Sequence, residues 1–211
     1  MLTAHMSQFF QIHSDNPQHR LIHQAVEIIR SGGVIAYPTD TAYALGCHIG
    51  DKRAVDRIRQ IRQLDDRHNF TLVCKDLSEL ANYAQVNNSQ FRMLKNHTPG
   101  PYTFILKGSR EVPRRLMHPK RKTIGIRVPD DLIVKALLSE LGSPLMSTTL
   151  QLPNNNDPML DPYDIRQTLE PHLDLIIDGG YRGFEPTTVI SLLDDLPVII
   201  REGKGETTPF R

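Results

Sequence analysis

The chain has little of what marks a secreted, membrane-spanning or zinc-binding protein. Its 211 residues include only two cysteines, Cys47 and Cys74, and neither has a second cysteine or a regular histidine spacing nearby. A disulfide framework and a zinc site are therefore not expected. No apolar run is long enough to span a bilayer, and residues 1–11 have neither the basic start nor the apolar segment of a signal peptide. We expect a cytoplasmic protein with no membrane partner, in which residues 1–6 form an unstructured N-terminal extension.

Several familiar catalytic motifs are also missing. There is no Walker-type glycine-rich loop, no dinucleotide fingerprint and no nucleophile elbow. The nine histidines are scattered without a partner pattern. We therefore assign no catalytic residue and no metal ligand, and we expect no tightly bound cofactor.

The net charge of +1 hides two segments of opposite sign. Residues 107–122 contain seven basic residues against Glu111 alone, whereas residues 151–195 contain nine acidic residues against two arginines. A polyanion such as RNA is a natural partner for the first segment, and a plain solvated surface explains it about equally well. The candidate RNA-binding residues come from this segment and from the cationic side of a helix expected over residues 51–64: Arg59, Arg110, Arg114, Arg115, Lys120, Arg121 and Lys122.

Short runs rich in valine and isoleucine alternate with fewer helical patterns. Helical spacing predicts helices that begin at Asn16 and Pro17 and over residues 51–64, 77–84, 89–95, 132–141 and 161–170. Apolar runs predict strands near residues 9–12, 34–37, 70–74, 102–107, 123–128, 144–150, 175–178, 187–192 and 198–201. Because strands so outnumber crossover helices, we predict an α/β single domain over residues 1–211, with a twisted mixed parallel and antiparallel sheet flanked by helices.

Polar residues follow several of the expected strands. Thr39, Asp40 and Thr41 come directly after the buried run at residues 34–37, where an ordinary turn and a ligand site are equally good interpretations. Similar residues stand at other strand ends: Thr123 with Arg127, Ser147 to Thr149, Thr187 with Thr188, and Arg201. A guanidinium grips a carboxylate or phosphate with two parallel hydrogen bonds, so this combination indicates an anionic ligand.

Five ordered blocks of the sequence resemble the YrdC-like family, the threonylcarbamoyl-adenylate synthases of tRNA modification and their relatives. The blocks are Pro38-Thr39-Asp40-Thr41-Ala42-Tyr43-Ala44-Leu45-Gly46, Pro99-Gly100-Pro101-Tyr102-Thr103, Thr123 to Pro129, Pro186-Thr187-Thr188-Val189, and Arg201 with Gly203. Together they cover nearly the whole chain. Arg62-Gln63-Leu64 and His68-Asn69-Phe70-Thr71 are most similar to the YciO branch of that family.

The resemblance implies a YrdC-like fold with a basic concave face and a pocket for threonine and for ATP or AMP. ATP would enter with Mg²⁺ as a substrate. The residues that it places at the pocket are Thr39, Asp40, Thr41, Tyr43, Arg62, Thr123, Arg127, Ser147, Thr149, Thr188 and Arg201.

Two departures from the family pattern leave the reaction open. The synthases carry Lys-x-Arg where this chain has Arg62-Gln63-Leu64, and Ser-Ala-Asn where it has Thr149-Leu150-Gln151. We therefore place double-stranded RNA or tRNA binding, with an altered nucleotide pocket, slightly ahead of an active threonylcarbamoyl-adenylate synthase. A structural or regulatory relative without either activity is a third alternative.

Overall fold

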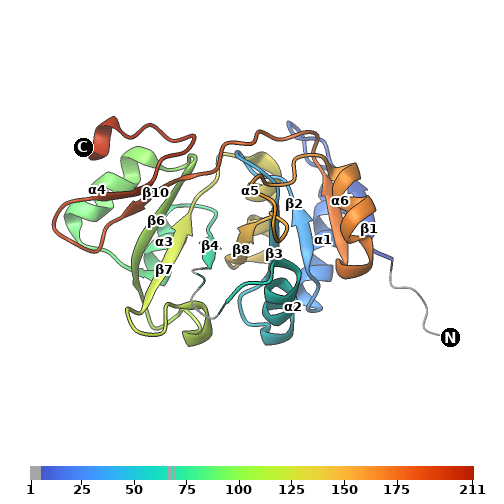
Figure 1. The fold of residues 1–211 in the computed structure, drawn as a ribbon, viewed down its shortest axis with the longest axis horizontal. Coiled ribbons are helices and arrows are strands. Elements are labelled where there is room, and N and C mark those ends of the chain that lie inside the picture. The colour runs from blue at the N-terminus through green and yellow to red at the C-terminus, as the bar shows by residue number, and fades with distance from the viewer. Residues whose placement is uncertain (1–5, 66–67, 69) are drawn as a thin grey trace.

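The structure, a computed structural model, describes residues 6–65, 68 and 70–211, so most of the expected N-terminal extension lies outside the described residues (Figure 1). Its helices are α1 (His19–Arg30), α2 (Lys52–Arg62), α3 (Leu77–Tyr83), α4 (Asn88–His97), α5 (Leu132–Leu141) and α6 (Pro162–Leu169), with short 3₁₀ turns η1 (Arg114–Leu116), η2 (Glu170–His172) and η3 (Thr208–Phe210). Its strands are β1 (Gln8–Gln11), β2 (Ile35–Tyr37), β3 (Ala44–His48), β4 (Thr71–Val73), β5 (Ala84–Gln85), β6 (Tyr102–Gly108), β7 (Thr123–Arg127), β8 (Leu145–Thr149), β9 (Leu175–Asp178), β10 (Thr188–Ser191) and β11 (Val198–Arg201).

All these strands join one mixed sheet, which confirms the predicted fold class. The strand order is β1-β9-β2-β3-β8-β4-β7-β6-β10-β11, and β5 pairs with β6. The pairs β1–β9, β2–β9, β4–β7 and β6–β10 are parallel, and the others are antiparallel. Because the ladder is continuous, it connects the two ends of the molecule seen in Figure 1.

Helices cover both faces of the sheet around β2 and β9. Ile35 belongs to an apolar cluster with α1 and α5, whereas its neighbour Ala36 belongs to a second cluster that includes residues of α2 and α6. Successive strand residues point to opposite faces, so each short strand supplies both clusters. This double coverage explains why β2 and the first three residues of β9 carry no charged side chain.

The β6 and β7 region is different, because its two faces differ in character. Phe104 and Ile126 pack in the apolar cluster that contains residues of α3 and α4. Their neighbours Thr103, Gly125 and Arg127 point to the other face and line a cavity. The fold thus leaves a polar sheet face available in the middle of the molecule.

Two local predictions were wrong. The sequence did not reveal strand β3, which lies between β2 and β8. Helix α1 begins at His19 after Gln18, which provides no side-chain cap, rather than at Asn16 and Pro17.

Within the described part of the chain, none of the helices combines the length and the apolar character required to cross a bilayer.

Candidate functional site

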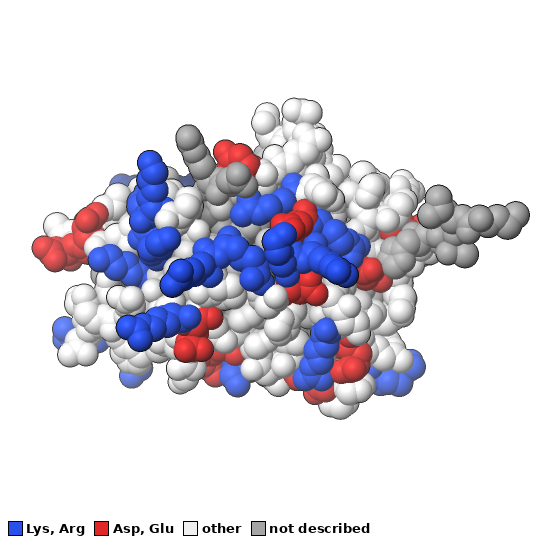
Figure 2. All heavy atoms as spheres, turned by 90° about the horizontal axis from the view of Figure 1, so that it is seen from below, with Lys and Arg blue, Asp and Glu red and all other residues white. Residues whose placement is uncertain are grey.

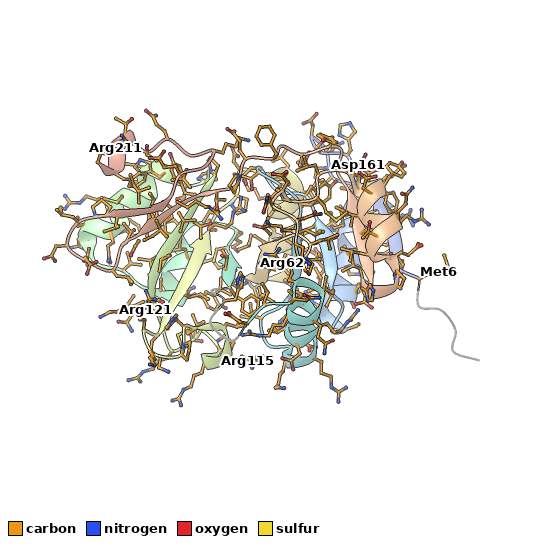
Figure 3. All side chains as sticks on the ribbon, in the orientation of Figure 1. Met6, Arg62, Arg115, Arg121, Asp161 and Arg211 are labelled. Carbon is orange, nitrogen blue, oxygen red and sulfur yellow. The ribbon has the colours of Figure 1, made fainter. Side chains whose placement is uncertain are left out.

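A cavity of about 260 Å³ lies over the centre of the sheet, where elements distant in sequence meet. Its basic lining residues are Arg62, His68, Arg127 and Arg201. The lining residues with a hydroxyl group are Thr41, Tyr43, Thr71, Thr103, Ser147, Thr148, Thr149 and Thr187. Figure 3 shows Arg62 at the end of α2, between the two halves of the ribbon. No aspartate or glutamate is among the described residues that line this cavity, which we call the arginine pocket.

Arg127 is the most deeply buried cation of the arginine pocket. Its guanidinium donates to the Asp40 carboxylate, and the two side chains are only 10% and 8% exposed. The other oxygen of Asp40 accepts from the backbone N–H of Asp130 at 3.1 Å. The Nε of Arg127 is buried and has no hydrogen-bond partner among the described residues. Asp40 therefore orients Arg127 through Nη2, and Nη1 has no hydrogen-bond partner among the described residues.

The loop after β2 is held by its own side chains. The Thr39 hydroxyl donates to the Ala42 carbonyl at 2.7 Å and accepts from the Thr41 N–H at 3.2 Å. The Tyr43 hydroxyl donates to the Gly180 carbonyl at 2.8 Å and accepts from the Gly179 N–H at 3.2 Å. Burial raises the pKa of Tyr43 well above its usual range, so the hydroxyl stays protonated. Thr39 and Tyr43 thus shape the loop, and Thr41 presents its side chain to the pocket.

Arg62 and His68 form the side of the pocket next to α2. Arg62 donates to the Gln151 carbonyl, and its buried Nε has no hydrogen-bond partner among the described residues. Burial lowers the pKa of Arg62, which still remains protonated at neutral pH. Burial, and then the charges of Arg62 and Arg59, lower the pKa of His68, whose Nε2 lies 3.3 Å from the Thr148 hydroxyl. Sequence reasoning gave His68 no role, because nothing near it in sequence indicates these spatial neighbours.

Arg201 completes the cationic lining from β11. Its guanidinium donates to the Thr187 carbonyl at 2.9 Å and to the Thr187 hydroxyl at 3.1 Å. Thr187 also shares a 2.9 Å hydrogen bond with Thr103. Burial, and then the charge of Arg127, lower the pKa of Arg201. Arg127 and Arg201 are therefore close enough to repel each other, and an anion would relieve that repulsion.

Not every sequence candidate lies at the arginine pocket. Thr188 is fully buried, and its hydroxyl donates to the Gly205 carbonyl at 2.6 Å and accepts from the Gly203 N–H at 3.0 Å. Thr123 is at the opposite end of β7 from Arg127, a separation of roughly 13 Å for a strand. Thr187 and Thr103 stand at the wall instead.

The two departures from the family pattern have different positions. Leu64 packs against the apolar core and is not among the pocket-lining residues. Gln151 lines the pocket, and its side-chain amide donates to the Asn155 and Asn156 carbonyls at 2.7 and 3.0 Å. Ser147, also on the wall, shares a 2.6 Å hydrogen bond with Tyr37, whose pKa burial raises to about 12.

The candidate RNA-binding residues divide into engaged and projecting side chains. Arg59 donates to the Asp65 carbonyl at 2.8 Å and stacks over the Phe70 ring, and Arg115 donates to the Gly50 carbonyl at 2.6 Å. The others are exposed: Arg110, Arg114, Lys120, Arg121 and Lys122. Figure 2 shows lysine and arginine side chains gathered in a band on the face seen from below, and Figure 3 places Arg115 and Arg121 at that lower side.

Among the described residues, no group of three or more histidines, cysteines or carboxylates is placed to hold a metal ion.

Comparison with known proteins gives consistent matches. The family model named for Sua5, YciO and YrdC, and described as telomere recombination, matches residues 27–203. YciO of Escherichia coli strain K12 is 62% identical over 205 residues, which cover 97% of this chain and 100% of that protein. The crystal structure of E. coli YciO has a TM-score of 0.95 and covers 98% of this chain and 100% of its own.

One more distant relative is named for an enzymatic activity, and another has been solved with a ligand. Threonylcarbamoyl-AMP synthase of Bos taurus is 31% identical over 156 residues, which are 74% of this chain and 55% of that protein. P. abyssi Sua5, solved in complex with L-threonine, is 25% identical with a TM-score of 0.85 and covers 93% of this chain and 58% of its own. This chain thus spans little more than half of either protein.

Proposed function

The chain belongs to the Sua5, YciO and YrdC family, and on that premise we propose that the arginine pocket binds L-threonine together with an adenine nucleotide. One observation carries the proposal. Arg62, Arg127 and Arg201 line one cavity, and no aspartate or glutamate is among its described lining residues. Such a site favours a ligand with more than one anionic group. An amino acid carboxylate and a nucleotide phosphate supply two.

The roles of the arginines follow from their surroundings. Arg127 would hold the threonine carboxylate through Nη1, since Asp40 already fixes Nη2 and Nε is buried. Arg62 from α2 and Arg201 from β11 would contact phosphate oxygens. Ser147 would orient the same phosphates. Mg²⁺ would enter bound to ATP as part of that substrate.

The reaction that fits these ligands is the formation of threonylcarbamoyl-adenylate. The threonine amine and bicarbonate combine to give a carbamate and water. A carbamate oxygen then forms a bond to the α-phosphorus of ATP, while the bond to the β-phosphate bridging oxygen breaks and pyrophosphate leaves with the electron pair. The pocket would contribute alignment of the two substrates and neutralisation of the phosphate charge.

An assay with ATP labelled at the α-phosphate tests this proposal. L-threonine, bicarbonate and Mg-ATP should give a labelled adenylate and an equal amount of pyrophosphate, and omission of threonine should abolish both. Pyrophosphate release that does not depend on threonine would overturn the assignment of the amino acid. Absence of both turnover and ATP binding would overturn the function as a whole.

A second candidate function is the binding of double-stranded RNA or tRNA at the exposed cations of residues 110–122. The gathering of lysine and arginine side chains in Figure 2 favours it. Binding of this kind is mostly electrostatic and depends on the shape of the duplex. Replacing Lys120, Arg121 and Lys122 by glutamine should therefore weaken duplex binding. The slope of log affinity against log salt concentration should also become shallower, by about one unit per lost phosphate contact. Unchanged affinity in that triple variant would exclude this surface.

A further inference from the structure

The segment between β6 and β7, residues 109–122, is a long loop that the structure anchors at several points. The Ser109 hydroxyl donates to the Asn82 carbonyl at 2.6 Å, and the Ser109 N–H donates to the Tyr83 carbonyl at 2.9 Å. Val112 and Leu116 are only 2% and 1% exposed, so both are part of the core. Arg115 fastens the loop to the turn before α2 through the Gly50 carbonyl. The backbone that carries the exposed cations is therefore held in place by hydrogen bonds and by core packing.

The tip of this loop is closed by a histidine side chain. The backbone N–H groups of Lys120 and Arg121 donate to His118 Nδ1 at 3.3 and 3.1 Å. The His118 N–H donates to the Thr123 carbonyl, and the Lys122 N–H donates to the His118 carbonyl, each at 2.9 Å. A side-chain acceptor that binds the N–H groups two and three residues ahead replaces the backbone bonds of a regular turn.

The backbone of Lys122 shows how tightly the tip is held. Lys122 has φ of 56°, in the left-handed region that side chains other than glycine seldom adopt. Its carbonyl accepts from the Gly108 N–H at 3.0 Å. The turn bond to His118 and this bond to β6 hold Lys122 in that conformation, so three consecutive cations project from a defined backbone.

The chain contains the same arrangement once more, without the cations. His13 Nδ1 accepts from the N–H groups of Asp15 and Asn16, both at 3.2 Å. There the turn presents an acidic residue and an amide. His13 is therefore a matched control for His118, because its replacement removes the same kind of turn and leaves residues 118–123 intact.

We propose that His118 is a positioning residue for duplex RNA, whose Nδ1 fixes the turn that presents Lys120, Arg121 and Lys122 to the phosphate backbone. The inference rests on the second candidate function. A fixed backbone reduces the ordering that long cationic side chains undergo when they bind, and preorganisation of this kind increases affinity without adding a contact. Loss of the turn would leave all three charges in place and free their backbone.

The test compares four variants with the wild type in binding to a duplex RNA of about 20 base pairs. This length exceeds the stretch of duplex that one double-stranded RNA-binding domain contacts. The variants are His118→Ala, His118→Asn, His13→Ala and the triple variant Lys120→Gln, Arg121→Gln, Lys122→Gln. We expect His118→Ala to weaken binding about three- to tenfold, a range set by the ordering of a few long side chains. His118→Asn should restore binding to within about twofold, because an asparagine oxygen can accept the same N–H groups. His13→Ala should bind like the wild type.

Hydrogen exchange at the backbone N–H groups of Lys120 and Arg121 provides the second measurement. Exchange should accelerate in His118→Ala and return toward the wild-type rate in His118→Asn. If the wild type does not bind duplex RNA, the RNA function itself is wrong. If the triple variant binds duplex RNA like the wild type, this surface is wrong, and the role of His118 with it. If the triple variant binds weakly while His118→Ala loses its turn and keeps full affinity, RNA binding stands and the positioning role of His118 is wrong.

Discussion

The buried guanidinium of Arg127 is paired with the carboxylate of Asp40, across the gap between the end of β7 and the loop after β2. The pair joins two segments that are 87 residues apart. Arg127 lines the arginine pocket, and Asp40 lines a neighbouring cavity. The orientation of Arg127, and with it the end of the pocket at which we propose that threonine binds, therefore depends on Asp40.

Removal of the Asp40 charge should destabilise the free protein. Asp40→Asn leaves a cation that is 10% exposed without its counter-charge, and breaking a buried pair in this way costs about 3–5 kcal/mol. The free energy of unfolding in urea measures the loss. The matched control is Asp56→Asn, which breaks the exposed Lys52 pair, with side chains 75% and 48% exposed, and should cost about 0.5 kcal/mol or less. Equal losses in both variants would contradict the role of Asp40.

A methyl group at Gly125 should obstruct the floor of the arginine pocket. A Cβ there would stand 3.0 Å from the Thr71 hydroxyl and 3.3 Å from the Thr103 methyl. We expect Gly125→Ala to weaken ATP binding because the added methyl group narrows the cavity, and to lower the stability by about 1–3 kcal/mol because Thr71 and Thr103 must shift. Titration calorimetry measures the loss of affinity, and urea unfolding measures the loss of stability. Gly183→Ala is the control, since its Cβ would meet only the Thr41 carbonyl at an ordinary 3.8 Å.

The protonation of His68 should be linked to anion binding. Burial and the charges of Arg62 and Arg59 hold the pKa of His68 below its ordinary 6.5 in the free protein. A bound phosphate would offset those charges and raise this pKa, so His68 would take up a proton on binding and the affinity would rise as the pH falls below 6.5. Calorimetry in two buffers of different ionisation enthalpy counts the protons. Proton uptake that is the same in His68→Gln would show that another group is responsible.

The lowered pKa of His68 also predicts how the stability of the free protein depends on pH. Because the unfolded chain binds the His68 proton more readily than the folded state, the free energy of unfolding should decrease as the pH falls through 6.5. In His68→Gln this part of the pH dependence should vanish. An unchanged pH profile in the variant would contradict the lowered pKa.

Restoring an arginine at position 64 should not restore a phosphate contact by itself. Leu64 packs against the apolar core and is not a pocket-lining residue, so Leu64→Arg places a charge against apolar neighbours. We expect the variant to lose about 1–3 kcal/mol of stability and to bind ATP within twofold of the wild type. A gain in ATP affinity of tenfold or more would show that position 64 reaches the pocket.

The strand at residues 35–37 could be predicted from the sequence because a short apolar run ends at a proline, and the mixed sheet followed from the excess of strands over helices. Strand β3 could not, because Ala44 to His48 is buried almost throughout and shows no polar alternation. The adjacent threonines 187 and 188 show the same limit at the site. The strand-end pattern includes both, and the family resemblance selects Thr188. In the structure Thr187 lines the pocket, while Thr188 binds Gly203 and Gly205. His68 depends likewise on contacts that the local sequence does not carry.

The most direct test of the central claim is calorimetric titration of the protein with Mg-ATP in the presence of L-threonine. The variants are Arg62→Gln and Arg201→Gln, with Arg211→Gln as control because Arg211 is 64% exposed and pairs with Glu202 outside the pocket. We expect each pocket variant to bind about 10–100-fold more weakly than the wild type, because each loses a charge-assisted hydrogen bond to the ligand. The control should bind within about twofold of the wild type. Equal affinities in all four proteins would contradict an arginine pocket for threonine and nucleotide.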